Sequence, residues 1–293
     1  MKPLLLDVNS LLKNSIHVKE IRTRRLSDQL HFHNVFEIAL IVKGNGRRIV
    51  GDNVDNFSDG DLTILAPNLP HVAYSDKKYH VKETSAMMHA VVIYFQPDWI
   101  AEYHLNSPEF APIRLLLKQL SRGIKVYGNA RSQIAALLMK IREADGLKAF
   151  IMLLEILYIV VRSKDYSYLA SQGYSSTYNE HSIRRIHEVY KYVMENFTDR
   201  IYLEDVASLS CMTPSAFCKY FRSKTKKTFT NFVNEVRIQY ACGLLRDENL
   251  DISDICFKSG FNNFSSFNKN FKHYIHSTPS AYRRKFSFAN MAD

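Results

Sequence analysis

The chain has 293 residues, of which 46% are hydrophobic, and its 39 Lys and Arg outnumber its 29 Asp and Glu, for a formal net charge of +10 at pH 7. This length predicts two domains with cores of ordinary size, and the positive charge favours a polyanionic partner. The start of the chain lacks the composition of a signal peptide and no apolar run is long enough to span a bilayer, so we expect a cytoplasmic protein with no membrane partner.

Residues 15–103 are strand-like. Phe36–Val42 and Met87–Phe95 are apolar runs rich in residues that favour strands, and turn sequences lie between them at short intervals. The turn sequences are Gly44-Asn45-Gly46, Gly51-Asp52-Asn53, Asp59-Gly60-Asp61 and Pro67–Pro70. Several short strands at this spacing predict a small barrel or sandwich.

One polar motif lies within this strand-like region. His31, His33 and Glu37 form the pattern HxHxxxE, and His71 follows in a second block. The spacing resembles the two motifs of cupin barrels, which implies that three histidines and one glutamate converge on a metal inside the barrel. Even separations place His31, His33 and Glu37 on one face of a strand. Imidazole and carboxylate ligands of this kind suit Fe, Mn, Ni or Zn.

After Pro108 the apolar residues recur with the period of a helix. Three apolar stripes, within residues 113–120, 134–141 and 150–161, predict three helices that cover the barrel and offer an apolar face to a second copy of the chain. The segment that follows is rich in Ser and Tyr and has no apolar period. We therefore predict a first domain over residues 1–163, a linker over 164–181 and a second domain over 182–293.

The second domain contains one pattern written twice. Phe217, Lys219, Phe221 and Arg222 reappear about fifty positions later as Phe267, Lys269, Phe271 and Lys272. Each copy reads as a short helix, a tight turn and a second helix, which is the plan of a helix-turn-helix. An amphipathic stretch over residues 228–246 joins the copies. As a helix about 27 Å long, it would hold the two second helices about one turn of B-DNA apart.

The second helix of each copy has an inward apolar face and an outward polar face. In the first copy Thr213 suits the N-cap and Pro214 the first helical position, while Phe217 and Phe221, four residues apart, face inward. The outward face carries Ser215, Cys218, Lys219 and Arg222. In the second copy the corresponding residues are Ser265, Asn268, Lys269 and Lys272. Short polar and basic side chains of this kind reach base edges or phosphates from the major groove.

A longer signature surrounds these faces. It comprises Phe229–Ile238 with Ala241 and Leu244-Leu245, then Ile252 through Ile255-Cys256, Ser259-Gly260-Phe261, Thr278-Pro279-Ser280 and Tyr282-Arg283. From about residue 183 to 286 the chain resembles the AraC-type transcription regulators. The resemblance implies seven helices, and base-reading positions at Pro214, Ser215, Cys218 and Lys219 and at Phe264, Ser265, Asn268 and Lys269. Because Pro214 and Cys218 cannot make bidentate contacts, more weight falls on Lys219 and Asn268.

These observations predict an α+β protein with an N-terminal cupin-like β-barrel, a helical dimerisation segment and a C-terminal all-α domain with two helix-turn-helix units. The predicted function is that of a sequence-specific, effector-responsive transcription regulator, not an enzyme. It would bind double-stranded DNA as a homodimer and need no cofactor. The alternative is a cupin metalloenzyme, a dioxygenase or isomerase, fused to a DNA-binding domain.

The sequence leaves three interpretations of the histidine cluster open. The residues are inherited barrel residues without a ligand, or they hold a metal through His31, His33, Glu37 and His71, or they line a small-molecule pocket, as sensor domains of AraC-type regulators usually do. The predicted pocket residues are His31, His33, Glu37, Arg47 and His71. Such a pocket favours a small polar effector, with a sugar preferred.

Overall fold

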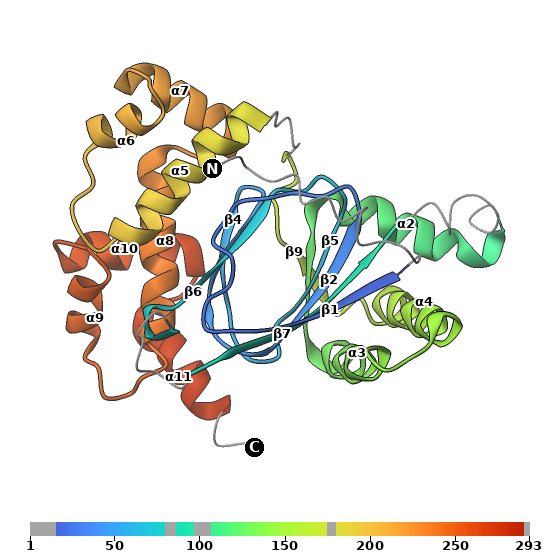
Figure 1. Cartoon of the computed structure of the whole chain (residues 1–293). Coiled ribbons are helices and arrows are strands. Elements are labelled where there is room, and N and C mark those ends of the chain that lie inside the picture. Colours follow the sequence, from blue (N-terminus) through green and yellow to red (C-terminus); the bar gives the residue numbers. More distant parts are fainter. Residues whose placement is uncertain (1–15, 80–85, 97–106, 175–179, 290–293) are drawn as a thin grey trace. The chain divides into compact units, whose positions relative to one another are not determined.

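The computed structural model describes residues 16–79, 86–96, 107–174 and 180–289 (Figure 1). The chain divides into two compact units, with the main boundary at residue 177. The first unit combines two β-sheets with helices, and the described residues from 180 to 289 form helices and their connections. This confirms the predicted α+β class. Within the described residues, no helix is long and apolar enough to cross a membrane.

Two sheets form the first unit. The larger has the order β1-β7-β2-β5-β8-β9, from Ile16–Thr23 (β1), Met88–Phe95 (β7), Phe36–Lys43 (β2), Leu62–Leu65 (β5), Ile124–Val126 (β8) and Tyr166–Tyr168 (β9). The smaller has the order β4-β3-β6, from Asn53–Phe57 (β4), Gly46–Val50 (β3) and His71–Ser75 (β6). Strand β2 pairs antiparallel with both β7 and β5, which places Glu37 between Tyr94 and Leu65.

The helices of the first unit cover one face of the larger sheet (Figure 1). They are α2 (Ala111–Gln119), α3 (Gly128–Ile141) and α4 (Gly146–Ser163), with 3-10 turns at Lys77–Tyr79, Pro108–Phe110 and Leu120–Arg122. Successive side chains of a strand point to opposite faces, so Ile38 and Leu40 of β2 pack against these helices while Ala39 and Ile41 point to the other face. The three helices predicted from apolar stripes are thus confirmed.

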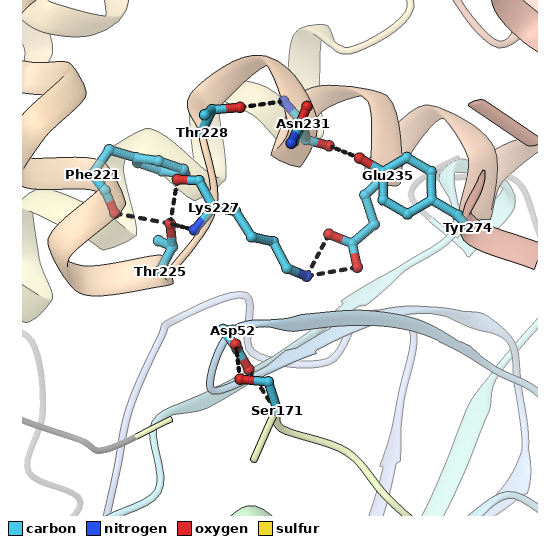
Figure 2. Close-up of polar contacts among 9 residues, drawn as sticks. All are labelled: Asp52, Ser171, Phe221, Thr225, Lys227, Thr228, Asn231, Glu235 and Tyr274. Atoms are coloured by element: carbon cyan, nitrogen blue, oxygen red, sulfur yellow. Dashed lines mark hydrogen bonds and ion pairs between the residues drawn. The ribbon is translucent and has the colours of Figure 1, made fainter. Parts of the chain in front are cut away.

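Part of the segment predicted as a linker is built into the first unit. Strand β9 pairs with β8, and Leu169 and Ala170, which follow it, are buried. Ser171 donates hydrogen bonds from its backbone N and from Oγ to the carboxylate of Asp52, over 2.9 and 2.5 Å (Figure 2). The sequence shows no regular spacing of apolar residues here, because these residues form only a short edge strand and a turn. The rest of the predicted linker includes residues 175–179, which lie outside the described ranges.

The second unit consists of helices in its described part from residue 180. They are α5 (Glu180–Asn196), α6 (Leu203–Leu209), α7 (Pro214–Thr225), α8 (Phe229–Leu244), α9 (Ile252–Lys258), α10 (Phe264–Ile275) and α11 (Pro279–Ala289). The side chain of Thr213 caps α7 by accepting from the backbone N of Ala216, and Asn263 caps α10 by accepting from Ser266. Gly260 has a φ of +84° in the turn before α10, a conformation that favours glycine.

Helix α8 supports both second helices through separate apolar clusters. Phe217 and Phe221 of α7 pack against Phe229 at the start of α8, with ring centroids 5.4 and 5.5 Å apart. Phe267 and Phe271 of α10 are fully buried in a cluster with apolar residues from the second half of α8. The inward phenylalanine pair of each repeat therefore fixes the rotation of its helix and turns the opposite face outward.

Polar contacts add to this support (Figure 2). The ammonium of Lys227, in the turn after α7, lies 2.7 and 2.8 Å from the two carboxylate oxygens of Glu235 on α8, and Glu235 is buried. The hydroxyl of Tyr274 on α10 donates to the backbone oxygen of Asn231 on α8 over 2.8 Å. Because a buried carboxylate is costly without a cationic partner, Lys227 stabilises the junction of α7 with α8.

Candidate functional site

The second helix of the first repeat presents its polar face to solvent. Ser215, Cys218, Lys219 and Arg222 are all exposed. Pro214 is partly buried at the start of α7, whereas Phe217 and Phe221 on the opposite face are fully buried. The structure therefore brings these predicted DNA-binding residues together on one accessible helix.

Helix α10 repeats this arrangement. Phe264, Ser265, Lys269 and Lys272 are exposed. Asn268 is partly buried, so its amide is less accessible than the ammonium of Lys269. An exposed aromatic side chain at Phe264, 44% accessible at the start of the helix, can contact an apolar group such as a thymine methyl.

Both helices contain basic residues and no acidic ones. Neither Pro214–Thr225 nor Phe264–Ile275 contains an Asp or Glu. An exposed basic face of this kind is typical of a surface that binds the phosphate backbone of nucleic acid.

A hollow of about 770 Å³ lies beside α7 and includes residues that sequence patterns missed. Lys219 and Arg222 line it together with Arg200, Arg237 and Asn262. Arg237 donates to the backbone oxygens of the α5–α6 connection, so its role is structural. Arg200 is exposed in that connection and adds a basic group. It lies outside both repeats, so a comparison of the two copies could not find it.

The first unit contains a cavity of about 150 Å³ lined by residues of both sheets. Most of its wall is apolar and comes from β1, β2, β3, β5, β6 and β7. Its polar and titratable side chains include His31, Glu37, Arg48, His71 and Tyr94. Few polar groups in a mostly apolar wall are typical of a small-molecule site.

The four predicted cluster residues converge. Nε2 of His33 lies 3.1 Å from Oε2 of Glu37, and Nε2 of His71 lies 3.5 Å from the same oxygen. The rings of His31 and His71 are 4.3 Å apart between centroids. His33, Glu37 and His71 are buried and His31 is partly buried.

The expectation that His31, His33 and Glu37 share one strand is wrong. Strand β2 begins at Phe36, and a bend at residues 34–35 separates Glu37 from the two histidines. The segment before the bend is instead tied to β6 by backbone hydrogen bonds between His31 and His71, of 3.1 and 2.9 Å. The residues therefore meet through a bend and an isolated bridge to β6, not through strand alternation.

The predicted pocket residue Arg47 does not line the cavity, whereas its neighbour Arg48 does. Both belong to β3, whose side chains alternate between two faces, so only one of the two can point inward. Arg48 forms a buried ion pair with Asp61, and Asp61 also lies 2.9 Å from the ammonium of Lys125. The sequence predicted Arg47 as the basic pocket residue, because it does not show which of two adjacent arginines faces the cavity.

Interactions within the cluster determine which of its side chains are charged. Burial alone would raise the pKa of Glu37, but the neighbouring His71 and His33 hold it well below its usual value. Burial opposes a charge on His71 as well, yet the carboxylate of Glu37 raises its pKa. Burial together with the charge of His71 lowers the pKa of His31 to about 3, so that this imidazole is neutral. Burial and the Glu37 carboxylate raise the pKa of Tyr94.

This donor set fits a transition-metal ion. One ligand atom from each of His31, His33, Glu37 and His71 lies within 4.8 Å of all the others. Nε2 of His71 is buried, and its 3.5 Å contact with Glu37 is too long for a well-formed hydrogen bond. Imidazole with carboxylate is a donor set that first-row transition metals prefer.

Comparison with known proteins assigns both units to families. Residues 20–158 match the AraC-like ligand binding domain, and residues 206–285 match a helix-turn-helix domain. An uncharacterized HTH-type transcriptional regulator, YdeC of Bacillus subtilis, is 22% identical over 261 residues, covering 87% of this chain and 86% of YdeC. The HTH-type transcriptional activator RhaR of Mannheimia succiniciproducens is 19% identical over 260 residues, covering 88% and 87%.

One solved structure, that of ToxT from Vibrio cholerae, is 15% identical and covers 92% of this chain and 98% of its own, with a TM-score of 0.34. At that score the likeness carries no further conclusion. The two family matches lie on either side of the boundary at residue 177, and each contains the cluster or the helices described above.

Proposed function

We propose that this chain, which belongs to the AraC-type transcription regulators, changes its DNA binding when a small effector enters the cavity between the two sheets of its first unit. The observation that carries this proposal is the buried cluster of His31, His33, Glu37 and His71 beside a mostly apolar cavity. A ligand with a complementary polar end would satisfy these groups. The protein would act in the cytoplasm, by binding and not by turnover.

In this proposal residues 182–293 are the DNA-binding domain, and α7 and α10 enter consecutive segments of the major groove. The proposed contacts are Pro214, Ser215, Cys218, Lys219, Arg222, Phe264, Ser265, Asn268, Lys269 and Lys272. Their exposure on two acid-free helices supports these roles. Arg200 is added as a phosphate contact because it lines the hollow next to Lys219.

The proposed effector is small and polar at one end. The cavity of about 150 Å³ has room for a molecule of roughly benzene size. His31, Glu37 and His71 would hold the polar end, with His33 orienting Glu37, and Arg48 takes the place of Arg47. A sugar needs hydrogen-bonding partners around its whole ring, so the largely apolar wall supports a small acid or alcohol better than the sugar preferred from the sequence.

Effector-dependent DNA binding tests the proposal. A set of small acids, alcohols and sugars would be screened by thermal shift, because a ligand at 100 times its Kd stabilises the folded protein by about 2.7 kcal/mol. DNA sites would be selected from random sequence, and the affinity for them measured with and without each hit. We expect at least one hit to change the DNA affinity. Hits that stabilise the protein but leave DNA affinity unchanged would contradict the proposal.

We also propose that the chain forms a homodimer through α4. Leu147, Ile151, Leu154 and Tyr158 follow one another at intervals of four, three and four residues, the spacing of a coiled-coil seam. Leu147, Ile151 and Tyr158 are 73, 56 and 59% exposed in the single chain. An exposed apolar stripe of this regularity is typical of a helix–helix interface.

Replacing Ile151 by glutamate is expected to convert the dimer to a monomer, because the charge would lie in the centre of the apolar seam. Loss of the second half-site contact would then lower DNA affinity by about 100-fold. Sedimentation velocity and DNA titration measure the two effects. Gln133→Glu, which adds the same charge at an exposed position of α3, is the control. A dimer that persists in Ile151→Glu would exclude this interface.

A further inference from the structure

The three histidines of the cluster are oriented in the same way. Nδ1 of each ring lies at hydrogen-bond distance from a backbone oxygen: 2.8 Å from Gln29 for His31, 2.9 Å from Val35 for His33 and 2.8 Å from Leu69 for His71. A carbonyl oxygen only accepts, so each Nδ1 carries the proton. The backbone thus directs all three Nε2 atoms toward one point.

The carboxylate of Glu37 lies where these three Nε2 atoms converge. Oε2 lies 3.1 Å from Nε2 of His33 and 3.5 Å from Nε2 of His71; the longer contact is an ion-pair distance and not a well-formed hydrogen bond, although this nitrogen is buried. Buried polar atoms without a well-formed hydrogen bond are uncommon in folded proteins. Three nitrogens held by outer hydrogen bonds and one carboxylate are the arrangement by which proteins orient metal ligands.

The cavity gives access to this point. His31, Glu37 and His71 line the cavity, whereas His33 lies behind Glu37. An ion at the cluster would therefore face the apolar cavity on one side. A six-coordinate ion bound by four protein atoms keeps two positions open, and a ligand in the cavity can fill them.

We propose that the cluster binds one divalent transition-metal ion through Nε2 of His31, His33 and His71 and the carboxylate of Glu37, and that this ion receives the oxygen atoms of the effector. The effector is then a small chelating molecule, such as a hydroxy acid, with an apolar remainder in the cavity. This rests on the proposed effector-responsive function and names the chemistry by which the effector is recognised. Ions that accept six ligands, such as Co²⁺, Ni²⁺, Mn²⁺ or Fe²⁺, suit the role.

The test uses the full-length protein without a histidine tag, stripped with a chelator and titrated with Co²⁺ by calorimetry and visible absorption. We expect one Co²⁺ per chain, with absorption bands of nitrogen and oxygen ligation. His71→Gln is expected to weaken Co²⁺ binding at least 100-fold. His89→Gln is the matched control, because His89 is partly buried in the same unit but lies outside the cluster and contacts Glu20. Melting in metal-free buffer checks that both variants fold.

Absence of Co²⁺ binding in the wild-type protein would overturn the metal site, and so would equal affinity in His71→Gln. Should His71→Gln not fold, Glu37→Gln replaces it, because the amide keeps the shape of the side chain. A small-molecule hit that alters DNA affinity in metal-free protein would also refute the metal's role while leaving the proposed function intact. Conversely, stoichiometric Co²⁺ binding without any effector-dependent change in DNA affinity would support the site and count against the proposed function.

Discussion

Replacing Lys219 or Lys269 by alanine is expected to weaken binding to a selected DNA site by about 1–3 kcal/mol each and to relax preference at one position of that site. Both side chains are exposed on the outward face of a second helix whose opposite face is fixed by two buried phenylalanines. The two affected positions should lie about 10 base pairs apart, because in the proposed complex the two helices enter consecutive turns of the major groove.

A contact to phosphate has a different signature from a contact to a base. Loss of a phosphate contact weakens binding to all DNA sequences alike. It also reduces the slope of log affinity against log salt concentration by about one. Titration against single-base variants at two salt concentrations distinguishes the two contacts. Lys118→Ala is the control, because it removes the same charge from an exposed position of α2. If only one of the two lysine variants loses affinity, the helix of the other lysine contacts the DNA backbone without reading bases.

The second large effect is expected at Glu37. In Glu37→Gln the response of DNA affinity to the effector should be lost, because the neutral amide no longer attracts the imidazoles of His33 and His71. DNA affinity in the absence of effector should stay within a few-fold of the wild-type value, since Glu37 lies in the first unit and the helices proposed to read DNA lie in the second. DNA titration with and without effector measures both quantities.

The control for this variant is Glu143→Gln, which makes the same change at a side chain that is 83% exposed. It should respond to the effector as the wild-type protein does. Equal loss of DNA affinity with and without effector in Glu37→Gln would mean that Glu37 supports the fold and not the response.

Features that depend on the spacing of apolar residues within a few turns of a helix were predictable from the sequence. The inward faces of α7 and α10 follow from phenylalanines four residues apart, and the cap of α7 follows from Thr213 directly before Pro214. The polar face opposite each pair follows from helix geometry alone. For these helices the sequence contains enough information because every relevant contact lies within one or two turns.

Features that depend on register between distant segments were not predictable. Arg48 and not Arg47 lines the cavity because of which face of β3 is turned inward. The sequence does not show which of two adjacent arginines in a strand lies on that face. His31 and His33 reach Glu37 through a bend and a bridge to β6, whereas even spacing suggested one strand. Strand β9 was missed because its three residues are held by pairing with β8 and not by an apolar pattern of their own.

A base-by-base affinity map of the full-length protein on sites selected from random DNA tests the central claim most directly. The account predicts two blocks of base preference, with centres about 10 base pairs apart, in each half-site. The block read by α7 should disappear in Lys219→Ala and the block read by α10 in Lys269→Ala. A single block, or a uniform loss of affinity without change of preference in both variants, would contradict a regulator that reads DNA with two helices.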